Sequence, residues 1–323
     1  MKYALAMAFV PLLVTFAGQL STPDHQATFN RAFVSGGALP RWSGGFLASW
    51  GRNTLPADTG DNLILYNRDG RVVAKWRLWF PDASLVTIID AAASPEGHVA
   101  VTGRAVNASG QLAGFLASVS SGEAVARVIQ TSPFEGQWLE FGPDGTIWVL
   151  GYELGDKRMI RKAPEHSPLR RYDRAGKLIG EYLRWPAMNC GLHPAVESGG
   201  SWPQLAASSD RIGVFLPACR VWIEFNPQGE SLGSFQWHYP LQEVGASPKD
   251  RFKNMALRVV MTQDSRVFGT FGRGLFGLNR NTGTWEPVGL RPPLSQIDWL
   301  LGSDGDRIVY RTGRSELAWA KVE

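Results

Sequence analysis

One short pattern occurs six times along this chain, and this repetition limits the possible folds more than any other feature. Residues 97–104, GHVAVTGR, comprise a polar turn, a short apolar strand, and a small residue followed by a large polar one. Related segments end at Arg52, Tyr152, Arg220, Arg273 and Arg314. A unit that returns about every 50 residues is typical of a repeat architecture, in which each copy buries its apolar face against its neighbours.

Turns that end in glycine follow the same period. They lie at Asp69-Gly70, Ser121-Gly122, Ala175-Gly176, Gln228-Gly229 and Thr282-Gly283, which are 52, 54, 53 and 54 residues apart. Glycine supplies the positive φ that a tight hairpin needs, and an Asn or Asp shortly before most of these turns can bond the turn backbone. The 13 Trp and 16 Phe suit the half-buried surface of strands. Each repeat therefore reads as four antiparallel strands.

The two ends of the chain suggest how the repeats are arranged. The sixth repeat starts near Gln296 and stops at Glu323 after only three strands, while residues 27–34, ATFNRAFV, form a spare strand-like run before the first repeat. We therefore expect an all-β, six-bladed β-propeller of four-stranded antiparallel blades, with the ring closed by an N-terminal strand. A long open solenoid is the alternative, and the incomplete last repeat favours closure.

Two segments resemble a known group of folds. Residues 140–151, EFGPDGTIWVLG, and residues 170–180, RRYDRAGKLIG, resemble blades of the NHL-type and TolB-like six-bladed propellers. The resemblance runs from about residue 27 to the C-terminus, and its motifs are turn and strand signals that report the fold only. Propellers of this kind include scaffolds, ligand binders, lactonases and lyases, so the fold does not choose a function.

The N-terminus has the pattern of an export signal. Lys2 precedes an apolar run at residues 4–17, and the small residues Ala17 and Gly18 offer a cleavage point. The run is too short to span a bilayer comfortably. We expect residues 1–20 to be a signal peptide, residues 21–26 a flexible leader and residues 27–323 one propeller domain that is secreted or periplasmic. No stable membrane insertion is expected after cleavage; an uncleaved anchor is the alternative.

Cysteine count and charge narrow the expected chemistry. In an exported chain the two cysteines, Cys190 and Cys219, suggest a disulfide that pins a long loop, with two buried thiols as the alternative. The formal net charge of +4 is interspersed and forms no basic stripe, so no nucleic-acid partner is expected. The excess leaves room for an anionic ligand.

The residues that end the second strand of each repeat are the main candidates for binding. In a propeller they emerge on one face and surround the axis. They are Arg52, Arg104, Arg220, Arg273 and Arg314, with Tyr152 in the third blade. Guanidinium groups bind carboxylates and phosphates, so this face is expected to take an anionic small molecule, glycan or protein partner. The alternative is that each Arg pairs with a carboxylate of its own or the adjacent blade, or is merely solvated.

Long loops between blades reach the same face and carry Trp185 and Trp202. Such rings stack on sugars, and they equally serve to cap the central channel of a propeller. Both interpretations stay open.

Metal ligands and a nucleophile are poorly represented. No histidines are closely spaced, so neither a metal nor a cofactor is expected. Asp90 and Asp298 precede turn glycines by seven residues, and Arg258 is the fifth-blade counterpart. These residues could bind a cation in the channel, but an Asp–Arg pair across it is preferred. We find no set of Ser, His and Asp that spacing would bring together.

The sequence as a whole favours an exported propeller that binds a ligand or partner without catalysis, with an acidic glycan or a carboxylate as the leading ligand. A metal-assisted lactonase or lyase acting at the same face is the alternative. Such an enzyme would work through Asp90, Asp298, His193 or His238. Whether the protein is an enzyme stays open at this point.

Overall fold

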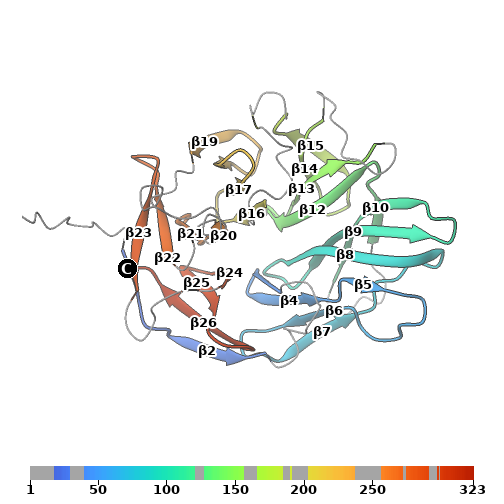
Figure 1. The fold of residues 1–323 in the computed structure, drawn as a ribbon, viewed down its shortest axis with the longest axis horizontal. Coiled ribbons are helices and arrows are strands. Elements are labelled where there is room, and N and C mark those ends of the chain that lie inside the picture. The colour runs from blue at the N-terminus through green and yellow to red at the C-terminus, as the bar shows by residue number, and fades with distance from the viewer. Residues whose placement is uncertain are drawn as a thin grey trace, which may run out of the picture.

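The fold is a ring of six β-sheets around a common centre, as Figure 1 shows. The structure is a computed structural model. It describes residues 18–29, 40–120, 127–155, 166–184, 190, 203–236, 256–271, 274–290, 297 and 299–323. Every regular element in these ranges is a strand. Across the same ranges, no helix has the length and apolar character needed to cross a membrane.

The first three blades each contain four antiparallel strands in chain order from the centre outwards. Blade 1 consists of β3 (Arg41–Ser43), β4 (Phe46–Trp50), β6 (Leu63–Tyr66) and β7 (Val72–Trp76). Blade 2 consists of β8 (Ala83–Ala93), β9 (Val99–Asn107), β10 (Leu112–Val119) and β11 (Arg127–Gln130), and the short β5 (Asn53–Thr54) pairs with β8. Blade 3 consists of β12 (Phe134–Phe141), β13 (Ile147–Glu153), β14 (Leu169–Tyr172) and β15 (Leu178–Tyr182).

The last three blades have the same plan. Blade 4 consists of β16 (Gln204–Ala207), β17 (Ile212–Leu216), β18 (Val221–Phe225) and β19 (Ser231–Gln236). Blade 5 consists of β20 (Ala256–Met261), β21 (Val267–Phe271), β22 (Gly274–Asn279) and β23 (Thr284–Leu290). Blade 6 consists of β24 (Trp299–Asp304), β25 (Arg307–Arg311), β26 (Glu316–Lys321) and β2 (His25–Thr28). The six-bladed, all-β prediction is confirmed.

The ring is closed by the N-terminal strand, as the sequence predicted. In Figure 1, β2 lies beside β26, and the two pair antiparallel with His25 opposite Trp319. The strand lies at 25–28, whereas the expected run was 27–34; of that run, residues 30–34 fall outside the described ranges. The ring of His25 packs edge-on against Trp319 at 4.8 Å between centroids, which favours this register.

The ordered part of the chain begins earlier than the sequence indicated. We expected residues 21–26 to be a flexible leader, but His25 and Gln26 belong to β2. In addition, β1 (Gln19–Leu20) pairs in parallel with β23, and Leu20 is fully buried. Cleavage at the small residues Ala17 and Gly18 would leave both strands in the mature protein, whereas cleavage after residue 20 would remove β1. The expected signal peptide itself, apart from residues 18–20, lies outside the described residues.

Most of the predicted hairpins are present, and their turn residues act as expected. Gly70 has φ 77° and Gly176 has φ 82°, values that suit glycine far better than other residues. The side chain of Asn67 accepts hydrogen bonds from the backbone N–H groups of Asp69 at 3.1 Å and Arg71 at 3.0 Å. The turn expected at Ser121-Gly122 lies outside the described residues.

The hydrophobic core lies between the blades, where the sheet faces meet. Trp42 of blade 1 packs edge-on against Trp319 of blade 6 at 4.9 Å, across the point of closure. Trp148 of blade 3 stacks on Tyr182, and the cluster around them continues into blade 4. Burying such large rings contributes about 2 to 3 kcal/mol each, so the many aromatic residues bind neighbouring blades together.

The ring has two faces, which differ in the chain connections that lie on them. On the turn face lie the turns that join the first and second strands of each blade, such as Gly44-Gly45. On the loop face, the second strands end and the chain passes from blade to blade. The antiparallel order of every blade places these connections on opposite sides of the ring.

Candidate functional site

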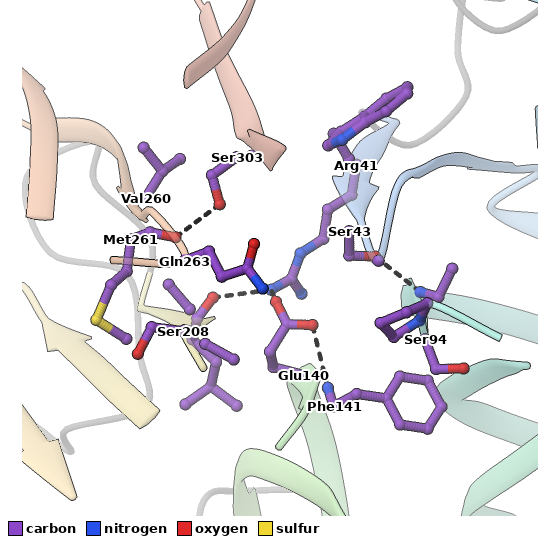
Figure 2. A pocket seen from close by; sticks show the side chains of 18 of the residues that line it. Arg41, Ser43, Ser94, Glu140, Phe141, Ser208, Val260, Met261, Gln263 and Ser303 are labelled. Atoms are coloured by element: carbon purple, nitrogen blue, oxygen red, sulfur yellow. Dashed lines mark hydrogen bonds and ion pairs between the residues drawn. The ribbon is translucent and has the colours of Figure 1, made fainter. Parts of the chain in front are cut away.

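A cavity of about 530 Å³ occupies the centre of the ring and opens at the turn face. The inner strands of all six blades, from β3 to β24, contribute to its walls. Residues of the first turns, including Ser94 and Gln263, form its rim, while Arg41, Glu140 and Arg258 lie deeper on the strands. Figure 2 shows Arg41 and Glu140 pointing toward each other in the middle of this cavity.

At the base of the cavity lies a group of four charges, which we call the channel cluster and of which all but Asp90 line the cavity. It consists of Arg41, Asp90, Glu140 and Arg258, from blades 1, 2, 3 and 5. Arg41 bridges the channel: Nη1 lies 2.8 Å from Asp90 Oδ2 and Nη2 lies 2.5 Å from Glu140 Oε2. It also donates to the backbone oxygen of Leu139 and, at 2.8 Å, to that of Leu205 in blade 4. One side chain thus ties four blades together.

Burial dominates the electrostatics of the two carboxylates. Asp90 is 1% exposed, and burial raises its pKa although Arg41 opposes the change. Burial likewise raises the pKa of Glu140, against the attraction of Arg41. For Arg41, burial disfavours the charge, but the two carboxylates outweigh it and the pKa is raised. The ion pairs with Arg41 therefore stabilise the buried charges of Asp90 and Glu140 in place of hydration.

Arg258 stands apart within the channel cluster. Burial, and then repulsion from Arg41, lower its pKa to about 10, although Asp90 and Glu140 act in the opposite direction. Its side chain faces the cavity and is only partly shielded from solvent. Among the described residues it has no hydrogen-bond or ion-pair partner within contact distance.

The sequence located two members of this cluster and missed the other two. The preferred Asp–Arg pair across the channel is present for Asp90, but its partner is Arg41 and not Arg258. Asp298 lies outside the described residues. Arg41 and Glu140 were missed because they stand at other distances from their turn glycines: Arg41 precedes the two-residue turn of blade 1, and Glu140 stands two residues nearer to Gly145 than Asp90 does to Gly97.

On the loop face, Arg52 and Arg314 are exposed. The backbone oxygen of Arg52 accepts a hydrogen bond from Ile88 on the inner strand of blade 2, which places Arg52 next to the channel. Arg314 lies between the second and third strands of blade 6. In the part of the chain that the structure describes, neither guanidinium has an ion-pair partner. Arg220 is also exposed and has φ 52°.

Two predicted residues do come together, through a glutamate that the sequence analysis did not single out. Arg104 Nη1 lies 3.8 Å from Glu135 Oε1, and the hydroxyl of Tyr152 donates to the same oxygen at 3.2 Å. Burial, and then the charge of Glu135, raise the pKa of Tyr152, which keeps its proton. These side chains border a second cavity of about 220 Å³ between blades 2 and 3, together with Leu85 and other apolar residues. For Arg104, then, the structure shows pairing with the adjacent blade.

The remaining predicted residues are only partly described. Arg273, Trp185 and Trp202 lie outside the described residues, as do His193 and His238. Cys190 and Cys219 form a disulfide, with Cα atoms 4.7 Å apart. Within the described ranges, no three His, Cys, Asp or Glu side chains come close enough together to hold a metal ion.

Asp90 is the one described residue of the enzymatic alternative. Its Oδ2 accepts hydrogen bonds from Arg41 and, at 2.9 Å, from the backbone N–H of Leu139. It is also absent from the cavity wall. Asp90 therefore braces the channel in this structure.

Comparisons with known proteins support the fold and go no further. No protein-family model matches the chain, and no curated protein matches it in sequence. Among solved structures, a provisionally assigned exported protein from Bacteroides fragilis is similar, with TM-score 0.55 and 10% identity over 96% of this chain and 97% of that one. A protein of unknown function from Bacteroides thetaiotaomicron has TM-score 0.50 and 12% identity, over 96% and 75%.

A gluconolactonase from Xanthomonas campestris is also similar, with TM-score 0.44 and 11% identity over 94% of this chain and 99% of that chain. All of these identities are far below the level at which function follows from similarity. The six sheets of this chain define it as a six-bladed propeller, and the two Bacteroides structures support that fold alone.

Proposed function

We propose that this protein is an exported, non-catalytic propeller that binds an anionic ligand or partner on its loop face. The observation that carries the proposal is the state of Arg52 and Arg314. Both are exposed, and neither has an ion-pair partner in the described ranges. A guanidinium with its donors facing solvent is available for a bidentate bond to a carboxylate.

The arginines elsewhere in the fold make this contrast informative. Among the described residues, seven of them lie within 3.0 Å of a carboxylate oxygen. They are Arg41, Arg170, Arg171, Arg211, Arg266, Arg280 and Arg307. Within the described ranges, Arg52 and Arg314 have no such pair, which leaves their donors available to a ligand.

Two observations support the exported location. The N-terminal run at residues 4–17 has the composition of an export signal. The disulfide between Cys190 and Cys219 is the kind of bond that persists in oxidising compartments. An acidic glycan of the cell surface or a carboxylate-bearing partner is the ligand class that fits such a location and such a charge.

The proposal is tested by calorimetric titration of the purified protein with polygalacturonate, an acidic polymer, and with neutral dextran. We expect binding to polygalacturonate alone, weakened by added salt because exposed charges are screened. The double variant Arg52→Gln/Arg314→Gln should lower the affinity about tenfold.

A matched control is the double variant Arg71→Gln/Lys177→Gln. It removes the same charge from exposed hairpins of the turn face and should leave the affinity within about twofold. Equal losses in both double variants would mean a general attraction between charged molecules, and absence of binding by the unaltered protein would overturn the proposal.

A further inference from the structure

We propose that the central cavity on the turn face is a second binding site, which takes a small hydroxylated monocarboxylate through the guanidinium of Arg258. This site lies at the opposite face from Arg52 and Arg314 and does not depend on the loop-face proposal. Its basis is the difference between the two arginines of the channel cluster in how many of their N–H donors form hydrogen bonds.

Arg41 uses its donors fully, whereas Arg258 does not. Arg41 donates to Asp90, to Glu140 and to two backbone oxygens of neighbouring blades. Arg258, on β20, lines the cavity and makes no hydrogen bond to any residue that the structure describes. A guanidinium carries five N–H donors, and those of Arg258 are free to bind an acceptor that enters the cavity. The cavity is the space into which an acceptor can come.

The carboxylates of the cluster are already occupied. Oδ2 of Asp90 accepts from Arg41 and from the N–H of Leu139. Oε2 of Glu140 accepts from Arg41, and Oε1 accepts from the N–H of Phe141 at 3.0 Å. Only Oδ1 of Asp90 is left without a hydrogen bond, and Asp90 does not line the cavity. Among the described residues, Arg258 is therefore left without an acceptor, and the cavity is open to one from a ligand.

Electrostatics favour an anion at this place. Burial and the charge of Arg41 lower the pKa of Arg258 to about 10, so the site penalises a positive charge that has no direct partner. An anion held against Arg258 would relieve both effects at once. Such a bond would also be stronger in this shielded site than on the surface, where water competes for the same donors.

Charge balance indicates a carboxylate and not a phosphate. The two arginines and two carboxylates of the channel cluster cancel, and the other charged residues of the cavity wall are Glu96, Asp304 and Arg174, with one excess negative charge. One carboxylate leaves the cluster with a single excess negative charge, whereas a phosphate dianion would leave two next to Asp90 and Glu140. A planar carboxylate also matches the fork of a guanidinium, as Arg280 illustrates by binding both oxygens of Glu224.

The remainder of the cavity fits a polar body. Its volume of about 530 Å³ is far larger than one carboxylate needs. At the rim, the side chain of Gln263 is exposed and points toward the middle of the cavity in Figure 2. An amide both donates and accepts hydrogen bonds, so it suits hydroxyl groups on the ligand. A sugar acid combines these features.

The test is a calorimetric titration of the purified protein with D-gluconate, D-glucuronate, inorganic phosphate and D-glucose. We expect at least one sugar acid to bind and glucose and phosphate to bind much more weakly. Arg258→Gln should lower the sugar-acid affinity about tenfold or more, because the charge-assisted bonds are lost. The loop-face variant Arg52→Gln/Arg314→Gln should bind sugar acids unchanged, which separates this site from the proposed function.

A second measurement needs no variant at Arg258 and guards against a folding defect. Phenylglyoxal modifies neutral guanidines, and mass spectrometry of peptides monitors each arginine separately. Saturating gluconate should slow the modification of Arg258 at least fivefold while leaving that of the exposed Arg314 unchanged. Binding that survives Arg258→Gln, tighter binding of phosphate than of sugar acids, or the absence of any protection by gluconate would overturn the proposal.

Discussion

Two groups of paired guanidinium and carboxylate side chains in this propeller shift the pKa of a buried carboxylate in opposite directions. One is the channel cluster; the other, which we call the interblade cluster, joins blades 4 and 5. The interblade cluster consists of Arg211, Trp222, Glu224 and Arg280. Glu224 and Asp90 are each 1% exposed. Even so, the pKa of Asp90 is raised, whereas that of Glu224 is lowered.

The difference lies in the partners. Burial alone would raise the pKa of Glu224, but hydrogen bonds from Arg280 and Trp222 outweigh it. The side chains of Arg280 and Arg211 are 28% and 24% exposed, so their charges keep part of their hydration, while Arg41 is 5% exposed. A buried carboxylate is thus stabilised when its guanidinium reaches water. The interblade cluster therefore stabilises the fold, whereas the channel cluster holds its charges in the channel against the desolvation penalty of burial.

The largest effect is expected from Arg41→Met. The change leaves Asp90 and Glu140 buried without their shared partner, and breaking a buried ion pair in this way costs about 3 to 5 kcal/mol. Urea unfolding monitored by tryptophan fluorescence measures the loss. Arg314→Met makes the same chemical change at an exposed site and should alter the free energy of unfolding by less than about 0.5 kcal/mol. A loss below about 1 kcal/mol for Arg41→Met would mean that the channel cluster does not brace the blades.

A smaller effect is expected from Arg280→Met in the interblade cluster. Glu224 keeps Arg211 at 3.0 Å and Trp222 Nε1 at 2.8 Å, so the carboxylate stays partnered. The expected loss is about 1 to 2 kcal/mol by the same urea assay. Combining it with Glu224→Gln in a double-mutant cycle isolates the pair. If Arg280→Met were as harmful as Arg41→Met, the exposure of the guanidinium would not be what separates the two clusters.

The sequence predicted the ring because the ring is encoded locally. Turn glycines such as Gly70 and the short polar residue Asn67 determine each hairpin within a few residues. The regular spacing of these hairpins then predicts the number of blades. The closing strand was also predicted, although its position depends on a distant partner, Trp319, and was therefore displaced by a few residues.

The channel cluster was harder to predict, because it depends on how the six inner strands are positioned relative to one another along the channel axis. Asp90 and Arg258 were found by counting back from the turn residues. Arg41 and Glu140 were not, because blade 1 has a shorter turn and Glu140 stands two residues nearer to its turn glycine than Asp90 does. The exposure of Arg52 and the pairing of Arg104 with Glu135 depend on neighbours in adjacent blades. No local pattern in the sequence reports such neighbours.

The smallest expected effect concerns pH and separates the clusters by sign. Because the pKa of Glu224 is lowered, folded protein binds fewer protons there than unfolded protein as the pH falls from about 5 to about 3, and stability is lost. At Glu140 the pKa is raised above 4.5, so the folded state takes up its proton first and stability is gained as the pH falls toward about 4.5. Glu224→Gln should therefore make the loss of stability below about pH 5 shallower, whereas Glu140→Gln should remove the gain of stability above about pH 4.5, each by about 1 kcal/mol. Urea unfolding at a series of pH values gives these slopes, with the exposed Glu316→Gln as a control that should leave the slope unchanged. Slopes that change in the same direction for both variants would show that the two clusters do not differ in the way their pKa shifts indicate.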